Sequence, residues 1–479
     1  MKKQSFIILA LFLFFILNPQ TTVEARWRSS KKPKHVIFLI HGIAGNKTHF
    51  GYMAKALART LNKKDPSRRY IVRSIEYDTG NNDKTPYDFA KDVDLQIKRI
   101  TASAKFKKDD KISLIMHSQG GLIGSIWVFQ SLMNTPGYST PETIAHLDSF
   151  ITLGTPFWGA KTAQWGSEIK NLTSQIGVDI PLPFGKNELE QMAFGSDTIF
   201  DFRMAMIDPQ YQKHIDYLKQ NVKFLNVVGV ANLLNPLGIF VSGTGQYEDD
   251  GAVPLASARF NFLYTQSIKS KYSSGDVTTL EKIKKIDIAP YVIVNAMHRS
   301  PLPELENFAG IAQIPEDCIK NESCRHPAFS YLWNTLLGNP VQQLDDNLGD
   351  FKTFLLDINI RVASENKYSC KDLKVEFFKL DGSPLNNSNI EISKFFELYS
   401  HGKNDSKKYP NHCRFYAMGS IKKTLESRTE AVLIKISGEN LKTRFIEMQV
   451  KEGYSSFVDI NLLSQVGRKD KGGARNEKK

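Results

Sequence analysis

The fold is decided by the stretch Ile112-Ser113-Leu114-Ile115-Met116-His117-Ser118-Gln119-Gly120-Gly121, which is followed by the apolar run Leu122 to Met133. The mostly apolar residues before Ser118 predict a buried strand, and the longer apolar run predicts a buried helix. A serine in the sharp turn between such elements is held strained, with its hydroxyl exposed, in an arrangement called a nucleophile elbow. Gly120 suits this turn because a Cβ at its position would collide with the preceding strand. The stretch predicts Ser118 as a nucleophile; the alternative is a buried serine in an ordinary turn.

One position departs from the usual elbow pattern, which also has glycine two residues before the serine. Met116 stands there in this chain, so a long side chain has to fit where glycine is normally needed. The helix that starts after Ser118 points its N-terminal amides and the positive end of its dipole at the serine. This end of the helix favours a negative charge that develops during a reaction.

A second signal lies upstream of the elbow. The apolar strand His35 to Ile40 leads into His41-Gly42-Ile43-Ala44-Gly45-Asn46 and then into a helix, Phe50 to Leu61. A loop after such a strand supplies one backbone N–H to an oxyanion hole, and the residue after the nucleophile supplies another. The amides of Ile43 and Gln119 are therefore the expected oxyanion donors.

Short apolar runs rich in β-branched residues alternate with amphipathic runs from His35 to about Pro340. Such runs are typical of strands buried on both faces of a parallel sheet, with helices packed on each side. The runs are His35 to Ile40, Tyr70 to Tyr77, Ile112 to Met116, Leu147 to Leu153, Val222 to Val230 and Tyr291 to Ala296. The predicted fold class is α/β, with a doubly wound and mostly parallel sheet.

The pattern changes after about Asp350. Short alternating runs, such as Lys374 to Leu380, Ala431 to Ile436 and Phe445 to Val450, predict a β-sandwich-like domain. The stretch from Gly467 onward is charged and has almost no apolar residues, which is typical of a disordered tail. We therefore expect an α/β domain at residues 26–340, a β-rich domain at 350–464 and a basic tail at 465–479.

The first 25 residues have the three-part layout of a secretory signal. Lys2 and Lys3 precede the apolar run Phe6 to Leu17, and Val23-Glu24-Ala25 offers a cleavage site. The apolar run is too short to span a bilayer comfortably, and the alternative is an uncleaved anchor. We expect an exported protein, secreted or periplasmic, whose mature chain begins near Arg26.

Four cysteines in 479 residues exclude a small protein built on disulfides. In an oxidising compartment the natural pairs are Cys318 with Cys324 and Cys370 with Cys413, although the sequence alone leaves the pairing open.

The formal net charge of +13 raises the question of a nucleic-acid partner. No nucleic-acid-binding module is recognisable, so the alternatives are a solvated surface and attraction to an anionic membrane surface. Lys47-Thr48 also ends a loop between a strand and a helix, as in a phosphate-binding loop, but that motif needs glycine where His41 and Asn46 stand. We expect neither a nucleic-acid partner nor a cofactor.

Three motifs together resemble the secreted lipases and esterases of the α/β-hydrolase superfamily. They are His41-Gly42-Ile43-Ala44-Gly45, His117-Ser118-Gln119-Gly120-Gly121 and Leu153-Gly154-Thr155-Pro156-Phe157-Trp158-Gly159-Ala160. The resemblance covers roughly residues 35 to 340 and does not reach the C-terminal domain. Because such lipases begin their cap after the Gly-Thr-Pro stretch, it implies a cap or lid at about residues 157–220. A fixed subdomain is the alternative for this insert.

The resemblance also implies the chain order Ser, then Asp or Glu, then His. The turn Glu248-Asp249-Asp250-Gly251-Ala252-Val253-Pro254 resembles the turn that carries the acid in many lipases. Asp250, directly before the glycine, is the expected acid, with Asp249 and Glu248 as alternatives.

The base is expected at the end of the last core strand. His298 follows Tyr291 to Met297 at the place where the family has its histidine. His326 is the runner-up, because the apolar helix Phe329 to Leu337 after it resembles the helix that follows the family's histidine.

These residues together predict a secreted serine hydrolase that cleaves carboxylic esters of lipids, as a lipase or phospholipase does. Ser118, His298 and Asp250 would form the catalytic triad of an acyl-enzyme mechanism. Two other functions stay open: a lipid acyltransferase that uses an alcohol in place of water, and a catalytically silent binding protein on a hydrolase scaffold. The acyl chain, the head group, the metal dependence and the oligomeric state also stay open.

Overall fold

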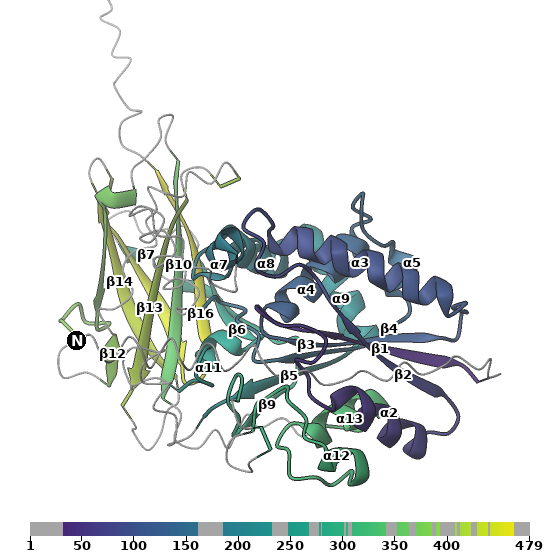
Figure 1. Cartoon of the computed structure of the whole chain (residues 1–479). Coiled ribbons are helices and arrows are strands. Elements are labelled where there is room, and N and C mark those ends of the chain that lie inside the picture. Colours follow the sequence, from purple (N-terminus) through teal and green to yellow (C-terminus); the bar gives the residue numbers. More distant parts are fainter. Residues whose placement is uncertain are drawn as a thin grey trace, which may run out of the picture. The chain divides into compact units, whose positions relative to one another are not determined.

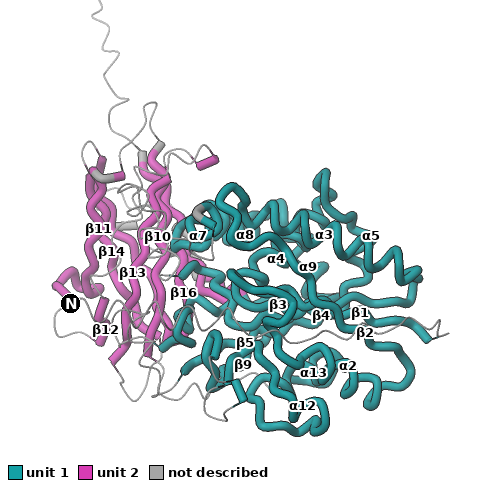
Figure 2. Tube along the Cα trace, viewed as in Figure 1, with its two compact units in different colours: residues 1–260, 287–349 teal, residues 261–286, 350–479 magenta. Residues whose placement is uncertain are grey.

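The computed structural model describes residues 32–160, 185–231, 248–267, 277–278, 280–300, 303–304, 309–341, 352–363, 370–385, 389–392, 408–409, 412–422, 429–438 and 441–463. The chain divides into two compact units, residues 1–260 with 287–349 and residues 261–286 with 350–479 (Figure 2). The expected signal at residues 1–25, the part of the expected cap at 161–184 and the tail at 465–479 lie outside the described residues.

The first unit contains a six-stranded sheet in the order β2-β1-β3-β4-β5-β9 (Figure 1). Every neighbouring pair in it is parallel, so all its strands end at the same edge. The strands are β1 (Lys34–Ile40), β2 (Arg69–Ile75), β3 (Lys111–His117), β4 (Leu147–Leu153), β5 (Lys223–Gly229) and β9 (Tyr291–Val294). They fall on the six apolar runs of the sequence, and the predicted α/β fold is confirmed.

Helices cover both faces of this sheet (Figure 1). On one face, α2 (Met53–Lys64) and α13 (Phe329–Leu337) place their apolar sides in one buried cluster with the strands. On the other face lie α3 (Pro86–Ser103), which begins at a capping box of Thr85 and Asp88, and α4 (Gln119–Leu132), whose residues are almost all buried. The other helical segments are α5 (Pro141–Ile144), α7 (Lys186–Met192), α8 (Asp197–Ile207), η1 (Pro209–Tyr211), α9 (Gln212–Asn221), α11 (Leu255–Ala258) and α12 (Asp317–Lys320).

The second unit has two sheets whose apolar residues share one core. The first has the order β12-β13-β10-β16-β6-β8 and the second the order β11-β14-β15-β7. Their strands are β6 (Phe262–Ser267), β7 (Val277–Thr278), β8 (Leu280–Ile286), β10 (Thr353–Ala363), β11 (Leu373–Phe378), β12 (Ile390–Ile392), β13 (His412–Ile421), β14 (Thr429–Gly438), β15 (Arg444–Lys451) and β16 (Ser455–Leu463). The β-rich region expected at the C-terminus is therefore present.

Residues 261–286 belong to the second unit, although they lie within the α/β domain expected at residues 26–340. Here β6 pairs in parallel with β16, with Phe262 beside Ser455, and β7 pairs with β15. The partner strands lie far along the chain, and local periodicity predicts a strand but not the sheet that it joins.

Two disulfides join the pairs that were expected. Cys318 in α12 bonds to Cys324, and Cys370, which begins the short helix η3 (Cys370–Asp372), bonds to Cys413 in β13. In the described part of the chain, no helix is both long and apolar enough to cross a membrane.

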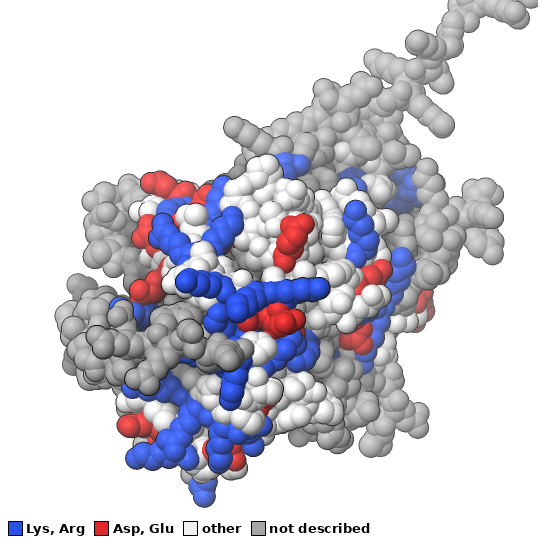
Figure 3. All heavy atoms as spheres, turned by 90° about the vertical axis from the view of Figure 1, so that its right-hand side faces the viewer, with Lys and Arg blue, Asp and Glu red and all other residues white. Residues whose placement is uncertain are grey.

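Basic residues begin several strands of the parallel sheet, namely Lys34, Arg69, Lys111 and Lys223. Lys111 and Lys223 both pair with the carboxylate of Asp148, so part of this charge is neutralised. Figure 3 shows one face of the molecule, on which Lys and Arg are spread among Asp and Glu. Attraction to an anionic membrane surface stays a prediction.

Candidate active site

Ser118 lies in the turn between β3 and α4, as an elbow requires. Its backbone has φ 54° and ψ −128°, a strained conformation for a residue with a side chain. The helix begins at the next residue, Gln119, so its first amides lie beside the serine. Gly120 is needed because a Cβ there would lie 2.3 Å from the backbone oxygen of Ile40. The obstacle is therefore the neighbouring strand β1 rather than the preceding strand β3.

The structure explains how Met116 fits into the elbow. Its side chain is fully buried, and a Cβ on Gly124 in α4 would lie 2.1 Å from the Met116 sulfur. The usual elbow has a glycine in the strand, whereas here the missing Cβ is in the helix that packs on it.

The loop after β1 passes directly over the serine. A Cβ on Gly42 would lie 2.6 Å from Cβ and 3.1 Å from Oγ of Ser118, so only glycine fits there. Among the described residues, the amides of Ile43 and Gln119 donate no hydrogen bond to any other group. Both expected oxyanion donors are thus available, one in this loop and one directly after Ser118.

Asp250 and His298 are joined by a hydrogen bond of 2.7 Å between the Asp250 Oδ2 and the His298 Nδ1. The other carboxylate oxygen of Asp250 accepts the amides of Ala252 and Val253 at 3.0 and 2.8 Å. The backbone N–H of His298 donates to the backbone oxygen of Asp250 at 2.7 Å. The buried carboxylate is therefore fixed on one side and directed at the imidazole on the other.

The alternative acids lie in the same turn but have other contacts. The Asp249 Oδ1 accepts the amide of Gly251 at 2.8 Å, which closes the turn locally. The backbone oxygen of Glu248 accepts the amide of Leu255 at 2.9 Å. Of the three acidic residues, the structure brings Asp250 to a histidine.

His326 is held as part of the core. Its Nε2 donates to the backbone oxygen of Gly310 at 3.0 Å, and its Nδ1 accepts the amide of Ala328 at 3.2 Å. Burial lowers the pKa of His326 to about 4. Both ring nitrogens are thus occupied by the backbone, and the structure does not bring this histidine to Asp250.

His117 is a neighbour of both Ser118 and His298. The rings of His117 and His298 lie 4.5 Å apart between centroids, and Ser118 is the next residue along the chain. Within the described part of the chain, no hydrogen bond joins the Ser118 hydroxyl to the His298 ring. Catalytic hydrogen bonds of this kind are often long before substrate binds.

A further histidine stands behind His117. The His49 Nε2 lies 2.7 Å from the His117 Nδ1, and burial lowers the pKa of both imidazoles well below the ordinary value. Neither histidine of this pair is among the predicted site residues. The position of His117 directly before the serine was the available signal, but nothing in the sequence indicated that His49 is its partner.

The chain matches known proteins in sequence and in structure. Residues 30–183 match the family described as "Putative serine esterase (DUF676)". The structure is similar to that of phospholipase PlaB from Legionella pneumophila, with a TM-score of 0.63 and 15% identity, over 90% of this chain and 94% of that chain. The chain has an α/β-hydrolase fold. The fold expected from the three motifs is thereby confirmed.

Two further structures are similar to this chain. PlaB in complex with thio-NAD matches with a TM-score of 0.64 and 14% identity, over 90% of this chain and 94% of that chain. Lipase BlEst2 of Bacillus licheniformis matches with a TM-score of 0.33 and 18% identity, over 50% of this chain and 83% of that chain. No curated protein sequence matches the chain.

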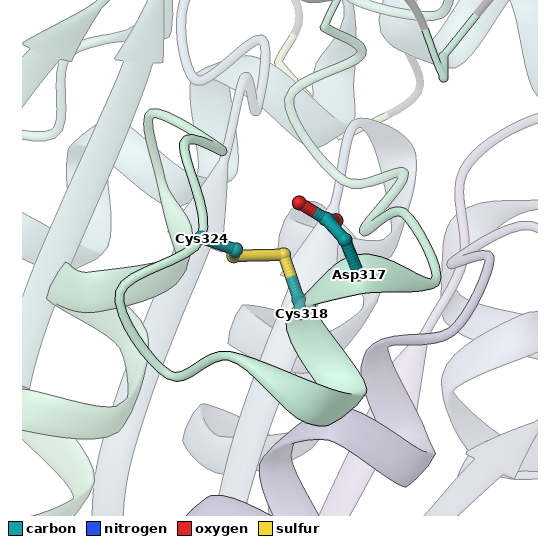
Figure 4. A group of neighbouring side chains, drawn as sticks. All are labelled: Asp317, Cys318 and Cys324. Atoms are coloured by element: carbon teal, nitrogen blue, oxygen red, sulfur yellow. A yellow bond between two sulfur atoms is a disulfide. The ribbon is translucent and has the colours of Figure 1, made fainter.

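Asp317 lies beside Cys318 and Cys324, a combination of residue types that often binds metals (Figure 4). In Figure 4 the two sulfur atoms are bonded to each other. A cysteine binds a metal as a free thiolate, and neither sulfur here is free, so this group is a disulfide with a neighbouring carboxylate.

Proposed function

We propose that this α/β-hydrolase is an exported serine hydrolase that cleaves carboxylic esters of lipids. The observation that carries the proposal is the combination at one edge of the sheet. A strained serine lies under a loop with a free amide, close to a histidine that is hydrogen-bonded to a buried aspartate. Ester hydrolysis by an acyl-enzyme needs these groups in this arrangement.

In the proposed reaction the Ser118 Oγ attacks the ester carbonyl while the His298 Nε2 accepts its proton. Because the His298 Nδ1 donates to Asp250, the Nε2 has a lone pair to accept that proton. The amides of Ile43 and Gln119 stabilise the tetrahedral oxyanion, and His298 then donates the proton to the leaving alcohol. Water, deprotonated by the same imidazole, attacks the acyl-enzyme and releases the carboxylic acid and the free serine.

Two observations support a lipid substrate and export. The solved structure that matches over 90% of this chain is that of a protein named as a phospholipase, so we propose a phospholipid or a related lipid ester. Two disulfides favour an oxidising compartment. The same site would serve a lipid acyltransferase if an alcohol replaced water in the second step.

The proposal is tested by activity and by covalent labelling. Ser118→Ala should abolish both hydrolysis of nitrophenyl esters and labelling by a fluorophosphonate, because both need the serine oxygen. Ser131→Ala is the matched control, since Ser131 is buried at the far end of the same helix and should leave both unchanged. Wild-type protein that reacts with neither reagent would contradict the enzyme proposal.

The base and the substrate are tested on the same preparations. His298→Ala should lower kcat roughly 10³-fold, as loss of a general base does, whereas His326→Ala should lower the thermal stability far more than the activity. The reverse outcome would assign the base to His326. Hydrolysis is then compared on triglyceride and phospholipid vesicles, with and without an acceptor alcohol. Acyl transfer that outpaces hydrolysis would favour the acyltransferase.

A further inference from the structure

A buried carboxylate holds the loop that lies behind the oxyanion hole. Glu188 in α7 has no exposed surface. Its Oε1 accepts the hydroxyl of Thr79 at 2.6 Å, and its Oε2 accepts the amides of Gly80 and Gly185 at 2.8 and 2.9 Å. No Lys, Arg or His of the described chain forms an ion pair with it. A buried charge needs such partners, so these three donors fix the positions of Thr79 and Gly80.

Thr79 connects this carboxylate to the oxyanion loop. Since its hydroxyl proton is donated to Glu188, the Thr79 Oγ1 presents a lone pair to the amide of Ala44, 3.0 Å away. Ala44 has φ 53°, a left-handed conformation that is unfavourable for a residue with a Cβ. It directly follows Ile43, the expected donor. The bond from Thr79 therefore holds a strained residue beside the amide that would contact the oxyanion.

Tyr77, in the same loop as Thr79, contacts the other side of the site. Its hydroxyl lies 2.8 Å from the backbone oxygen of His41 and 2.9 Å from the Gln119 Oε1. Its ring stacks on that of His41 at 4.4 Å. Burial raises the pKa of Tyr77 well above its ordinary value, so the hydroxyl stays a donor. Residues 77–80, which we call the support loop, thus contact the neighbours of both oxyanion amides.

We propose that Glu188, acting through Thr79, is a positioning residue that presets the oxyanion hole formed by Ile43 and Gln119. The proposal rests on the proposed function, because it assigns the support loop to that catalytic site. Glu188 comes from the segment expected to form the cap, so the docking of α7 would complete the catalytic machinery. In catalysis, donors that are fixed before the reaction are worth more than donors that must first be ordered.

Three variants test this chain of contacts. Thr79→Val keeps the shape of the side chain but removes both hydrogen bonds, and Thr79→Ser keeps both. Glu188→Ala removes the carboxylate that accepts the hydroxyl of Thr79 and the amides of Gly80 and Gly185. Thr335→Val is the matched control, because Thr335 is a buried threonine in α13 whose hydroxyl donates to the backbone oxygen of Tyr331 at 2.9 Å.

The readout is the ratio of kcat for an ester to kcat for the thionoester with the same acyl and leaving groups. A thionoester develops its charge on sulfur, which accepts hydrogen bonds weakly, so the ratio reports the oxyanion hole. Thr79→Val and Glu188→Ala should lower kcat for the ester roughly tenfold with little change in KM, and the ester-to-thionoester ratio should fall with it. Thr79→Ser and Thr335→Val should keep the wild-type ratio.

The outcomes separate this proposal from the proposed function. If the wild type hydrolyses the ester and Ser118→Ala does not, an unchanged ratio in Thr79→Val would overturn the positioning role alone. A partly unfolded variant lowers both rates equally and keeps the ratio, so a loss of kcat at constant ratio would also overturn it. If the ester-to-thionoester ratio also fell in Thr335→Val, the fall would not depend on the contacts of Thr79, and the proposal would be overturned.

Discussion

Met116 and Gly124 should be energetically coupled, because the side chain of one occupies the space that the other lacks. Met116 is fully buried, and a Cβ on Gly124 would lie 2.1 Å from its sulfur. Because Met116 is surrounded by other buried residues, its sulfur has little room to move aside. Three variants define a double-mutant cycle: Gly124→Ala, Met116→Ala and the two together.

The expected magnitudes follow from packing. Gly124→Ala should lower the free energy of unfolding by about 0–2 kcal/mol, since overpacking costs about 1–3 kcal/mol and the better helix propensity of alanine returns about 1 kcal/mol. Met116→Ala should lower it by about 3 kcal/mol, within the range for a buried methionine. In the double variant the new methyl group lies in space that the sulfur has left. The double variant should therefore lower the free energy of unfolding by about 2 kcal/mol, which is some 2 kcal/mol less than the sum of the two single variants.

The assay is urea unfolding followed by tryptophan fluorescence. Trp127 and Trp158 are buried in the first unit, and Trp127 lies in α4 itself, so the signal includes the elements under test. The slope of free energy against urea should stay constant across the cycle while the midpoint shifts. Single-variant effects that add to within about 0.5 kcal/mol would refute the reasoning, because they would show that the two side chains do not compete for space.

Two further predictions concern stability. His326 has its pKa lowered from 6.5 to about 4 by burial, so the unfolded chain binds a proton at a higher pH than the folded chain does. The stabilisation by neutral His326 is complete above pH 6.5 and is lost as the pH falls through 4. The difference in unfolding free energy between wild type and His326→Gln should therefore change by about 3 kcal/mol between pH 7 and pH 4. A difference that does not change with pH would contradict the lowered pKa of His326. The disulfides close loops with sequence separations of 43 for Cys370–Cys413 and 6 for Cys318–Cys324. Because the longer loop restricts the unfolded chain more, replacing Cys370 and Cys413 by alanine should lower the free energy of unfolding by about 4 kcal/mol, and replacing Cys318 and Cys324 by about 2 kcal/mol. Urea titrations that give the opposite order would contradict this explanation.

The strands of the parallel sheet could be predicted because each is an apolar run that is buried on both faces. The sheet that β6 joins could not, although Phe262 to Thr265 has the composition of a strand. Its partner β16 lies near the end of the chain, and pairing over such a separation depends on which apolar faces meet in the core. Local periodicity reports how much of a segment is buried, not its neighbour.

The candidate site shows the same difference between what local sequence predicts and what depends on distant segments. The turn that holds Ser118 was predictable because the elbow is a local structure whose residue types are set by one turn. Which of the three acidic residues lies beside which histidine depends on hydrogen bonds between distant segments. In each case the sequence limited the candidates to two or three, and in the structure one hydrogen bond of 2.7 Å joins Asp250 to His298.

Glu188 shows why a positioning residue is hard to recognise in a sequence. It stands in the first turn of α7, where an acidic residue that accepts the amide of Gly185 is ordinary helix capping. Capping accounts for one of its three hydrogen bonds, and an exposed carboxylate would make that bond equally well. The other two come from Thr79 and Gly80, more than a hundred residues earlier, and they require complete burial of the charge. Because capping alone explains an acidic residue at this position, the sequence does not indicate that Glu188 has further partners. The contact between α7 and the loop that holds Ala44 is therefore visible only in the folded structure.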